Sequence, residues 1–187
     1  MTTPSFEHYS ATRARELRAV VEDIYRRSYT EAIASGDPFD SPTEFMNRFD
    51  AYTDPRRSSG FELVLARVDD KPAGQTWGWP LPANARWWEQ LTLDEGDIRD
   101  FTLEDGSRTF ALSEIMVCAE HTGQGLARAL HDELIGSRPE QRATLLVEPD
   151  NDRAYAAYLK WGWHRVGSLR PQWENAPKFD VLIYINH

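Results

Sequence analysis

Residues 120–130 read EHTGQGLARAL and hold two glycines one residue apart, Gly123 and Gly125. They follow the apolar run TFALSEIMV (109–117) directly and precede an amphipathic stretch that ends near Ile135. Glycine weakens strands and helices but tolerates backbone angles and close approaches that other residues do not. The pattern therefore predicts a strand, a tight turn and a helix. Because a helix N-terminus carries unpaired N–H groups and a positive dipole end, we expect this turn to bind an anion, most commonly a phosphate.

The rest of the chain alternates between helical and extended patterns. Apolar spacings of three and four predict a first helix over 11–26, and a capping box at Ser41 predicts a second, shorter one. Apolar runs bounded by turn residues predict strands, the first two of which form a hairpin around DDKPAG. These strands are 61–68, 75–81, 109–118 and 142–148, with closing strands at WHRVGSL and FDVLIYI, and further helices are expected at 126–135 and 151–161.

The order of these elements predicts an α/β (α+β) fold with a mixed sheet. A strand-helix-strand connection sets its two strands parallel, whereas the early and late hairpins are antiparallel. Residues 82–106 are too long for a hairpin loop, and loops of that length are usually functional or carry structure of their own. We expect a short helix around ARWWEQL within this segment.

Composition narrows the class of partner. Lys and Arg total 21 against 30 Asp and Glu, a net charge of −9 that argues against nucleic acid as the main partner. The single cysteine, Cys118, forms no internal disulfide, and no run approaches the roughly 20 apolar residues of a membrane span. We therefore expect a cytoplasmic protein that contacts no membrane. The five histidines lack metal-ligand spacing, so no metal is expected.

Two kinds of phosphate site compete for the glycine turn. A G-x-G between strand and helix is also part of the dinucleotide fingerprint, which would make the chain a nucleotide-dependent oxidoreductase. Against this, Arg128 stands where the third glycine belongs, and too little chain follows for a doubly wound sheet. A P-loop is excluded because no G-K-S/T follows.

The glycine turn is a more specific signal when it is considered together with a second segment. TGQGLA (122–127), followed by NDRAYAAYLKWGW (151–163), resembles the GNAT superfamily of acyl-CoA-dependent N-acyltransferases. Gly125 and Ala127 fill the family's first motif, whereas Thr122 replaces its usual Gln or Arg. The second motif is filled by Asn151, Ala154, Tyr158, Gly162 and Trp163.

The resemblance implies a fold and a cosubstrate. It covers roughly residues 109–170, the expected acyl-CoA-binding core, and implies one domain over 1–187 in which 82–106 is an insertion or lid. The implied sheet is central, twisted and flanked by helices, with a splayed parallel strand pair. Acetyl-CoA is the implied cosubstrate, its pyrophosphate on the turn amides and its pantetheine on unpaired strand backbone. The expected cofactor-binding residues are Ile115, Met116, Val117, Thr122, Gly123, Gln124, Gly125, Leu126, Ala127, Asn151 and Tyr158.

The implied reaction is attack of a primary amine, on a small molecule or peptide, on the thioester. An amine with a pKa near 10.4 is neutral in only about one of 10³ molecules at pH 7, so a general base is expected. Glu114 is the first candidate, with a solvent-facing glutamate as the alternative, and Glu148 is the reserve candidate. Tyr158 is expected to protonate the leaving thiolate, with core packing as its alternative. A catalytically silent acyl-CoA-binding module is the alternative to the enzyme.

Four tryptophans gather in the hairpin and in segment 82–106. Trp77 and Trp79 are interpreted as core, with an aromatic wall for the ammonium of the amine as the alternative. Trp87 and Trp88 are interpreted as part of a lid or of a homodimer contact made by an exposed pair.

Overall fold

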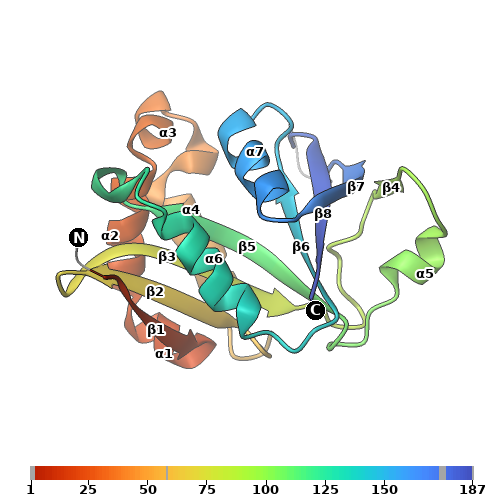
Figure 1. The fold of residues 1–187 in the computed structure, drawn as a ribbon, viewed down its shortest axis with the longest axis horizontal. Helices are drawn as coiled ribbons and strands as arrows, with labels where there is room; N and C mark the ends of the chain where they lie inside the picture. Colours follow the sequence, from red (N-terminus) through yellow and green to blue (C-terminus); the bar gives the residue numbers. More distant parts are fainter. Residues whose placement is uncertain (1–2, 58, 173–175, 187) are drawn as a thin grey trace. The chain divides into compact units, whose positions relative to one another are not determined.

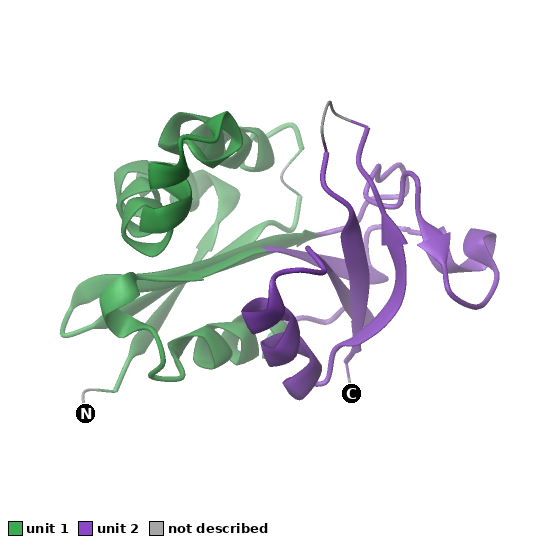
Figure 2. Cartoon of the chain, turned by 90° about the horizontal axis from the view of Figure 1, so that it is seen from above, with its two compact units in different colours: residues 1–79, 114–137 green, residues 80–113, 138–187 purple. Residues whose placement is uncertain are grey.

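A computed structural model describes residues 3–57, 59–172 and 176–186 of the chain. The chain divides into two compact units (Figure 2). The first unit comprises residues 1–79 and 114–137, and the second comprises residues 80–113 and 138–187. Strand β5 (Thr109–Val117) contributes residues to both units. The expectation of one domain over 1–187 stays a prediction.

The strands of the first unit are hydrogen-bonded in the order β1-β2-β3-β5. They comprise β1 (Ser5–Ser10), β2 (Glu62–Val68), β3 (Lys71–Pro80) and the last part of β5. The expected hairpin is confirmed, and its turn is Asp69-Asp70, with φ of 49° and 61°. Strand β1 was not expected, because none of its side chains is buried and it lacks the apolar alternation that identifies a strand.

Helices of the first unit lie on both sides of its strands (Figure 2). They are α1 (Ala11–Glu16), α2 (Arg18–Ser28), α3 (Thr30–Ser35), the 3-10 helix η1 (Pro38–Asp40), α4 (Pro42–Tyr52) and α6 (Leu126–Gly136). The single helix expected over 11–26 is wrong, because it breaks at Leu17. There the backbone N–H bonds to Ala14 three residues back, and this tight turn separates α1 from α2.

The main core of the first unit packs α1, α2 and α4 against one face of the strands. Phe45 and Phe49 of α4 meet Trp77 of β3, which is 1% exposed, so the core interpretation of Trp77 is confirmed. Helix α6 lies over the opposite face (Figure 1). Gly74 of β3 faces this helix, and a Cβ there would lie 2.9 Å from the Met116 carbonyl oxygen and 3.0 Å from Leu130 Cδ1. Only glycine permits this close approach.

The second unit contains the parallel part of the sheet. Its strands are hydrogen-bonded in the order β5-β6-β8-β7-β4, with β6 (Arg142–Val147), β8 (Phe179–Ile185), β7 (His164–Leu169) and β4 (Thr92–Leu93). Its helices are α5 (Ile98–Thr102) and α7 (Asp152–Lys160). Strands β5 and β6 are parallel and the other pairs of this unit are antiparallel, so the predicted mixed α/β sheet is confirmed.

The parallel pairing of β5 with β6 is short. Thr109–Ala111 of β5 pair with Arg142–Thr144 of β6, whereas Leu112 and Ser113 have no ladder partner on β6 among the described residues of this unit. The ladder between the two strands thus spans three residues on each strand in this unit, and the splay that the family resemblance implies stays a prediction.

Segment 82–106 differs from its prediction. The helix expected around ARWWEQL is wrong, because residues 83–84 and 87–90 form two separate turns, closed by bonds such as Glu89 N–H to the Arg86 carbonyl. Gln90 then has a φ of 63°, a left-handed conformation that ends any helical course. The helix of this segment lies later, at α5, where the Asp97 carboxylate accepts bonds from the N–H groups of Arg99 and Asp100.

A buried polar network joins this segment to the strands of its unit. Trp88 is 7% exposed, and its Nε1 donates to Glu104 Oε1 at 3.0 Å. The same oxygen accepts from Thr109 Oγ1 at 2.7 Å and pairs with the Arg142 guanidinium at 3.1 Å. Arg142 also donates to the Phe101 carbonyl at 2.6 Å. The interpretation of Trp88 as an exposed lid or interface residue is therefore wrong, because hydrogen bonding and burial hold its ring in the core.

We expect Glu104→Gln to destabilise the second unit. The substitution leaves the buried Arg142 guanidinium without a counter-charge, which costs about 3 kcal/mol of unfolding free energy. Urea denaturation measures this loss. The control is Glu89→Gln, which breaks an exposed pair with Arg86 and should leave the urea midpoint nearly unchanged. Equal midpoints for the two variants would show that the buried pair does not stabilise the fold.

A histidine bridges three elements of the first unit. His8 of β1 contacts Glu62 of β2 through Nδ1 at 2.6 Å and Glu133 of α6 through Nε2 at 2.9 Å. Burial alone would lower the pKa of His8, but the hydrogen bonds to the two carboxylates outweigh it and raise the pKa. The protonated ring donates to both carboxylates at once.

The His8 bridge should make stability depend on pH. A raised folded-state pKa means that the stabilisation is complete below the unfolded pKa of about 6.5 and is lost as pH rises through the folded value. We expect His8→Gln to unfold at lower urea than the wild type near pH 5.5, about one unit below that pKa, with the difference shrinking at higher pH. The control variant is His164→Gln, which removes an exposed histidine that lies outside this bridge.

Candidate active site

The turn after β5 is built from backbone bonds and two left-handed glycines. Cys118 N–H still bonds to the Ala73 carbonyl of β3 at 2.9 Å, and the 3-10 helix η2 (Ala119–His121) follows. Gly123 and Gly125 then have φ of 74° and 82°. A Cβ at either position would meet nothing within 4 Å, so it is the backbone conformation and not crowding that requires glycine.

This turn leaves the start of α6 open to an anion. Gly125 is the N-cap and has no side chain that accepts from the first turn, and the first helical bond runs from Ala129 N–H to the Gly125 carbonyl at 3.1 Å. The N–H groups of Leu126, Ala127 and Arg128 therefore have no acceptor within their own helix. Together with the helix dipole they favour a negatively charged ligand.

The side chains of the turn stabilise its shape. Thr122 Oγ1 donates to the Ala119 carbonyl at 2.9 Å, and Gln124 Nε2 donates to the Glu120 carbonyl at 3.2 Å. Both expected ligand residues thus use side-chain donors inside the turn, which leaves the backbone as the main contact surface. Their role as cofactor ligands stays a prediction.

Arg27 of α2 supports the turn from outside. Its guanidinium pairs with Glu120 in η2 and with Asp23 one helical turn earlier, and donates to the Pro72 carbonyl at 3.0 Å. Sequence reasoning missed Arg27, because the arginine and the turn lie 93 residues apart and only the fold brings them together.

Glu114 lies on β5 upstream of the turn, in the same unit. Its carboxylate has no hydrogen-bond donor among the described side chains, and its carbonyl accepts from Thr76 Oγ1 at 2.8 Å. The side chain is half-buried, and this burial raises its pKa to about 7, with the positive charge of Arg48 opposing the rise. A carboxylate with such a pKa can accept a proton at neutral pH.

Aromatic rings of the first unit lie on the face of the strands that carries the Glu114 side chain. Along β3 and β5, Cys118 N–H bonds to the Ala73 carbonyl, and Gln75 Nε2 lies 3.2 Å from Met116 Sδ. Continuing this antiparallel register by two residues places Trp77 opposite Glu114. Tyr25 of α2 stacks on Phe45 at 3.8 Å. Trp79, further along β3, is half-buried and packs against Tyr52 at 4.5 Å.

The remaining predicted residues belong to the second unit and are described there by themselves. Asn151 is the N-cap of α7, and its Oδ1 accepts from Ala154 N–H at 3.3 Å. Tyr158 is half-buried and packs edge-on against Trp161 and Trp163 at 5.6 and 6.1 Å. The reserve base Glu148 is exposed. The action of these residues on a shared cofactor stays a prediction.

Ile115, Met116 and Val117 continue β5 from Glu114 to the turn. Met116 is buried in the core, whereas Ile115 and Val117 are half-buried. The Met116 side chain is thus committed to packing, so a ligand would meet this residue through its backbone. Among the described residues, no three His, Cys, Asp or Glu side chains gather in a way that would hold a metal ion. No described helix combines the length and apolar character that a membrane crossing needs.

Comparison with known proteins identifies the family. The model of the Acetyltransferase (GNAT) family matches residues 19–163. No curated protein sequence matches the chain. The fold is similar to that of a Desulfovibrio desulfuricans protein assigned to the GNAT family, at 17% identity and a TM-score of 0.66 over 98% of this chain and 99% of that one.

Two further solved structures share the fold. An acetyltransferase from Thermus thermophilus is 13% identical with a TM-score of 0.65 and complete coverage of both chains. A GNAT family acetyltransferase from Elizabethkingia anophelis, solved with acetyl-CoA bound, is 14% identical with a TM-score of 0.60 over 98% of each chain. The predicted family and fold class are confirmed.

We expect Gly125→Ala to damage the turn. A Cβ at a φ of 82° costs about 1 to 2 kcal/mol, and relaxing it rotates the N–H groups that follow. Both the urea midpoint and the affinity for coenzyme A, measured by calorimetry, should fall. Gly136→Ala is the matched control, because this helical glycine also faces open space but does not have a positive φ. The control should be neutral or stabilised by about 0.5 to 1 kcal/mol.

Proposed function

Since the chain belongs to the GNAT family of acetyltransferases, we propose that it moves the acetyl group of acetyl-CoA to a primary amine of a small molecule or peptide by direct attack. The observation that carries the proposal is Glu114, a half-buried carboxylate with a pKa of about 7 on the strand that leads into the glycine turn. A group that changes protonation near neutral pH is suited to deprotonating an ammonium.

The proposed base removes the proton that keeps the amine from attacking the thioester. At pH 7 nearly all of an amine with a pKa of 10.4 is protonated, and the cost of removing that proton adds roughly 4 to 5 kcal/mol to the barrier of the attack. Glu114 accepts this proton, and the neutral nitrogen attacks the thioester carbonyl. Trp77 and Tyr25, which are themselves buried in the core, keep Glu114 poorly solvated and so favour the neutral carboxyl.

The proposed cofactor contacts are made largely by backbone groups of β5 and of the first turn of α6. The first-turn N–H groups of α6 take the pyrophosphate, and the backbone of Ile115 to Val117 pairs with the amides of pantetheine. Asn151 and Tyr158 complete the cofactor set, and the Tyr158 hydroxyl protonates the departing thiolate. Acetyl-CoA bound to the Elizabethkingia anophelis protein of the same fold supports this cosubstrate. The lone, buried Cys118 supports a cytoplasmic setting.

Glu114→Gln tests the base. Above a pH of about 7 the wild-type carboxylate is ionised, so kcat/KM should rise with pH through this value, and the variant should lose that limb. The measurement is free-thiol release from acetyl-CoA against a panel of amines across pH. Glu148→Gln is the control and should keep the limb. A variant with an unchanged profile would remove Glu114 from the mechanism, and acetyl-CoA binding without thiol release by the wild type would favour a silent binding module.

Tyr158→Phe tests the acid. Loss of the hydroxyl should lower turnover at least tenfold, since general acid catalysis contributes about 10² to 10⁴, with little change in acetyl-CoA affinity by calorimetry. Tyr155→Phe removes a hydroxyl from the same helix that donates to Asp180 at 2.9 Å, and this control should retain turnover. Equal rates for both variants would contradict the acid role of Tyr158.

A further inference from the structure

Arg48 of α4 holds its guanidinium against aromatic rings of the first unit. Its Cζ lies 4.1 Å from the centroid of the Phe39 ring and 5.9 Å from that of the Phe45 ring, and its Nη1 donates to the Phe39 carbonyl at 3.0 Å. The side chain is half-buried and Phe39 is 51% exposed, so part of the guanidinium stays accessible from solvent. A planar guanidinium that is stacked and anchored in this way loses little freedom when it binds a ligand.

The same aromatic rings connect Arg48 to Glu114. Phe45 stacks on Tyr25 with ring centroids 3.8 Å apart and lies 5.7 Å from the ring of Trp77, the residue opposite Glu114. Burial raises the pKa of Glu114 to about 7, and the charge of Arg48 opposes this rise. Burial also raises the pKa of Tyr25 to about 12, with the charge of Glu114 adding to the rise and Arg48 opposing it. The cation, the hydroxyl and the base thus lie within range of one another.

The guanidinium retains N–H donors that the fold does not use. A guanidinium carries five N–H groups in a planar fork. Arg48 donates to the Phe39 carbonyl and interacts with the Tyr25 hydroxyl, and it forms no ion pair with a carboxylate among the described residues. Asp40 also responds to this charge, because burial raises the pKa of its carboxyl and Arg48 opposes the rise. Donors of the fork are therefore left for a ligand, with the carboxylates of Glu114 and Asp40 in its surroundings.

The location of Arg48 distinguishes it from other cations of its unit. Arg15, Arg57 and Lys71 likewise form no ion pair with a described carboxylate, but none of them affects the pKa of Glu114. A cation beside carboxylates is complementary to a zwitterion, whose carboxylate faces the cation and whose ammonium faces the acids. A zwitterion also has no net charge, so the excess of nine acidic residues in this chain does not repel it.

We propose that Arg48 determines acceptor specificity by binding the carboxylate of an acceptor that carries a primary amine and an acidic group in one molecule. This role rests on the proposed acetyl transfer and identifies the class of its acceptor as an amino acid, bound as a zwitterion. The fork of Arg48 takes both carboxylate oxygens, since the planar geometries of guanidinium and carboxylate match. The ammonium then lies toward Glu114, which accepts its proton.

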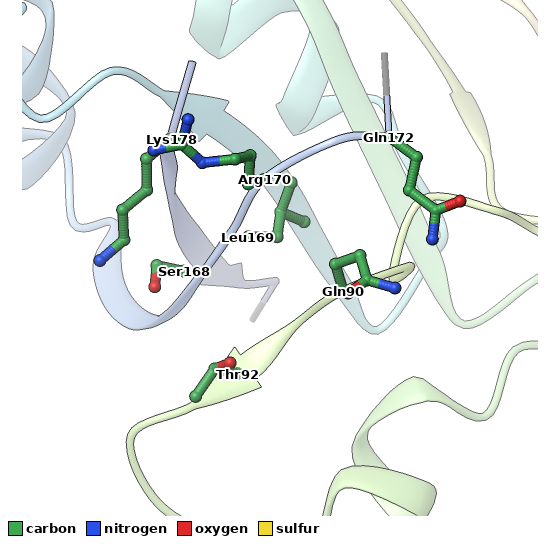
Figure 3. Close-up of a pocket in the computed structure, with 7 residues that line it drawn as sticks. All are labelled: Gln90, Thr92, Ser168, Leu169, Arg170, Gln172 and Lys178. Carbon is green, nitrogen blue, oxygen red and sulfur yellow. The ribbon is translucent and has the colours of Figure 1, made fainter. Parts of the chain in front are cut away.

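The residues that carry this inference all belong to the first unit. Figure 3 shows a pocket of about 510 Å³ in the second unit, where Gln90, Ser168 and Lys178 are among the residues that line it. That pocket shares no residue with the Arg48 site, and the acceptor class inferred from Arg48 does not depend on it.

Matched acids and amides test the acceptor class. Free-thiol release from acetyl-CoA is measured with unbranched amino acids that carry a terminal amine, from glycine to 6-aminohexanoate, and with the primary amide of each. At the best chain length we expect wild-type kcat/KM to favour the acid at least about tenfold, and Arg48→Gln to reduce this preference below about threefold. Arg15→Gln, which removes an exposed charge of the same unit, should keep the wild-type preference.

The design separates recognition from damage to the fold. Each preference is a ratio of two substrates measured on one preparation, so a partly unfolded variant still reports it. Arg48→Lys keeps the charge without the fork and should show an intermediate preference. In Arg48→Gln the rising limb of kcat/KM should also move to higher pH, because the charge that opposes the raised pKa of Glu114 is gone. An acid preference that survives in Arg48→Gln would overturn the proposal.

Binding is measured apart from turnover. The ¹⁵N-labelled full chain is titrated with each amino acid of the series and with its amide, in the presence of coenzyme A. The arginine Nε–H signal that Arg48→Gln lacks should shift saturably with an acid and not with its amide, and no shift with any acid would refute acid binding at Arg48. This shift without thiol release from any amine would contradict acetyl transfer and support acid binding. Thiol release at equal rates from acids and amides would contradict only the role of Arg48.

Discussion

The buried ion pair between Arg142 and Glu104 determines how the second unit holds together. Removing two charges from water is expensive, and part of this cost is offset because Thr109 and Trp88 also donate to Glu104 Oε1 and the Phe101 carbonyl accepts from Arg142, while Glu104 Oε2 is buried without a hydrogen-bond partner among the described residues. The pair connects segment 82–106 to both strands of the parallel ladder. What the sequence suggests is an appended loop is therefore part of the core, and the edge strand β4 and the strained Gln90 follow from that attachment.

A different constraint shapes the first unit, where backbone conformation matters more than side-chain chemistry. Two glycines with positive φ direct the chain so that α6 begins with its N–H groups uncapped. Glu114 obtains its raised pKa from burial beside aromatic rings and not from a charged partner. In the proposed mechanism, anion binding and proton transfer both depend on a partner that the fold withholds, which is a side-chain cap in the first case and solvent in the second.

The sequence predicts those parts of the fold and site that depend on local pattern. The turn at Gly123 and Gly125, the hairpin at Asp69-Asp70 and the capped helix after Asn151 all follow from residue types at fixed spacing. The exposed strand β1 has no apolar alternation, and ARWWEQL looks helical although burial of Trp88 against Glu104 imposes turns. Arg27 pairs with Glu120, 93 residues away in the sequence, and Arg142 pairs with Glu104, 38 residues away. No local sequence pattern predicts such contacts.

The packing beneath α6 affects the anion site proposed at the start of that helix. At Gly74 a Cβ would lie 3.0 Å from Leu130 Cδ1, so this side chain of α6 packs closely on β3 because the position has no side chain of its own. Leu130 makes this contact about one helical turn beyond the first-turn N–H groups at which anion binding is proposed. A larger residue at position 74 would thus displace α6 and alter the affinity of the proposed anion site. Such a change would leave every motif residue in place, because position 74 lies on β3, outside the glycine turn.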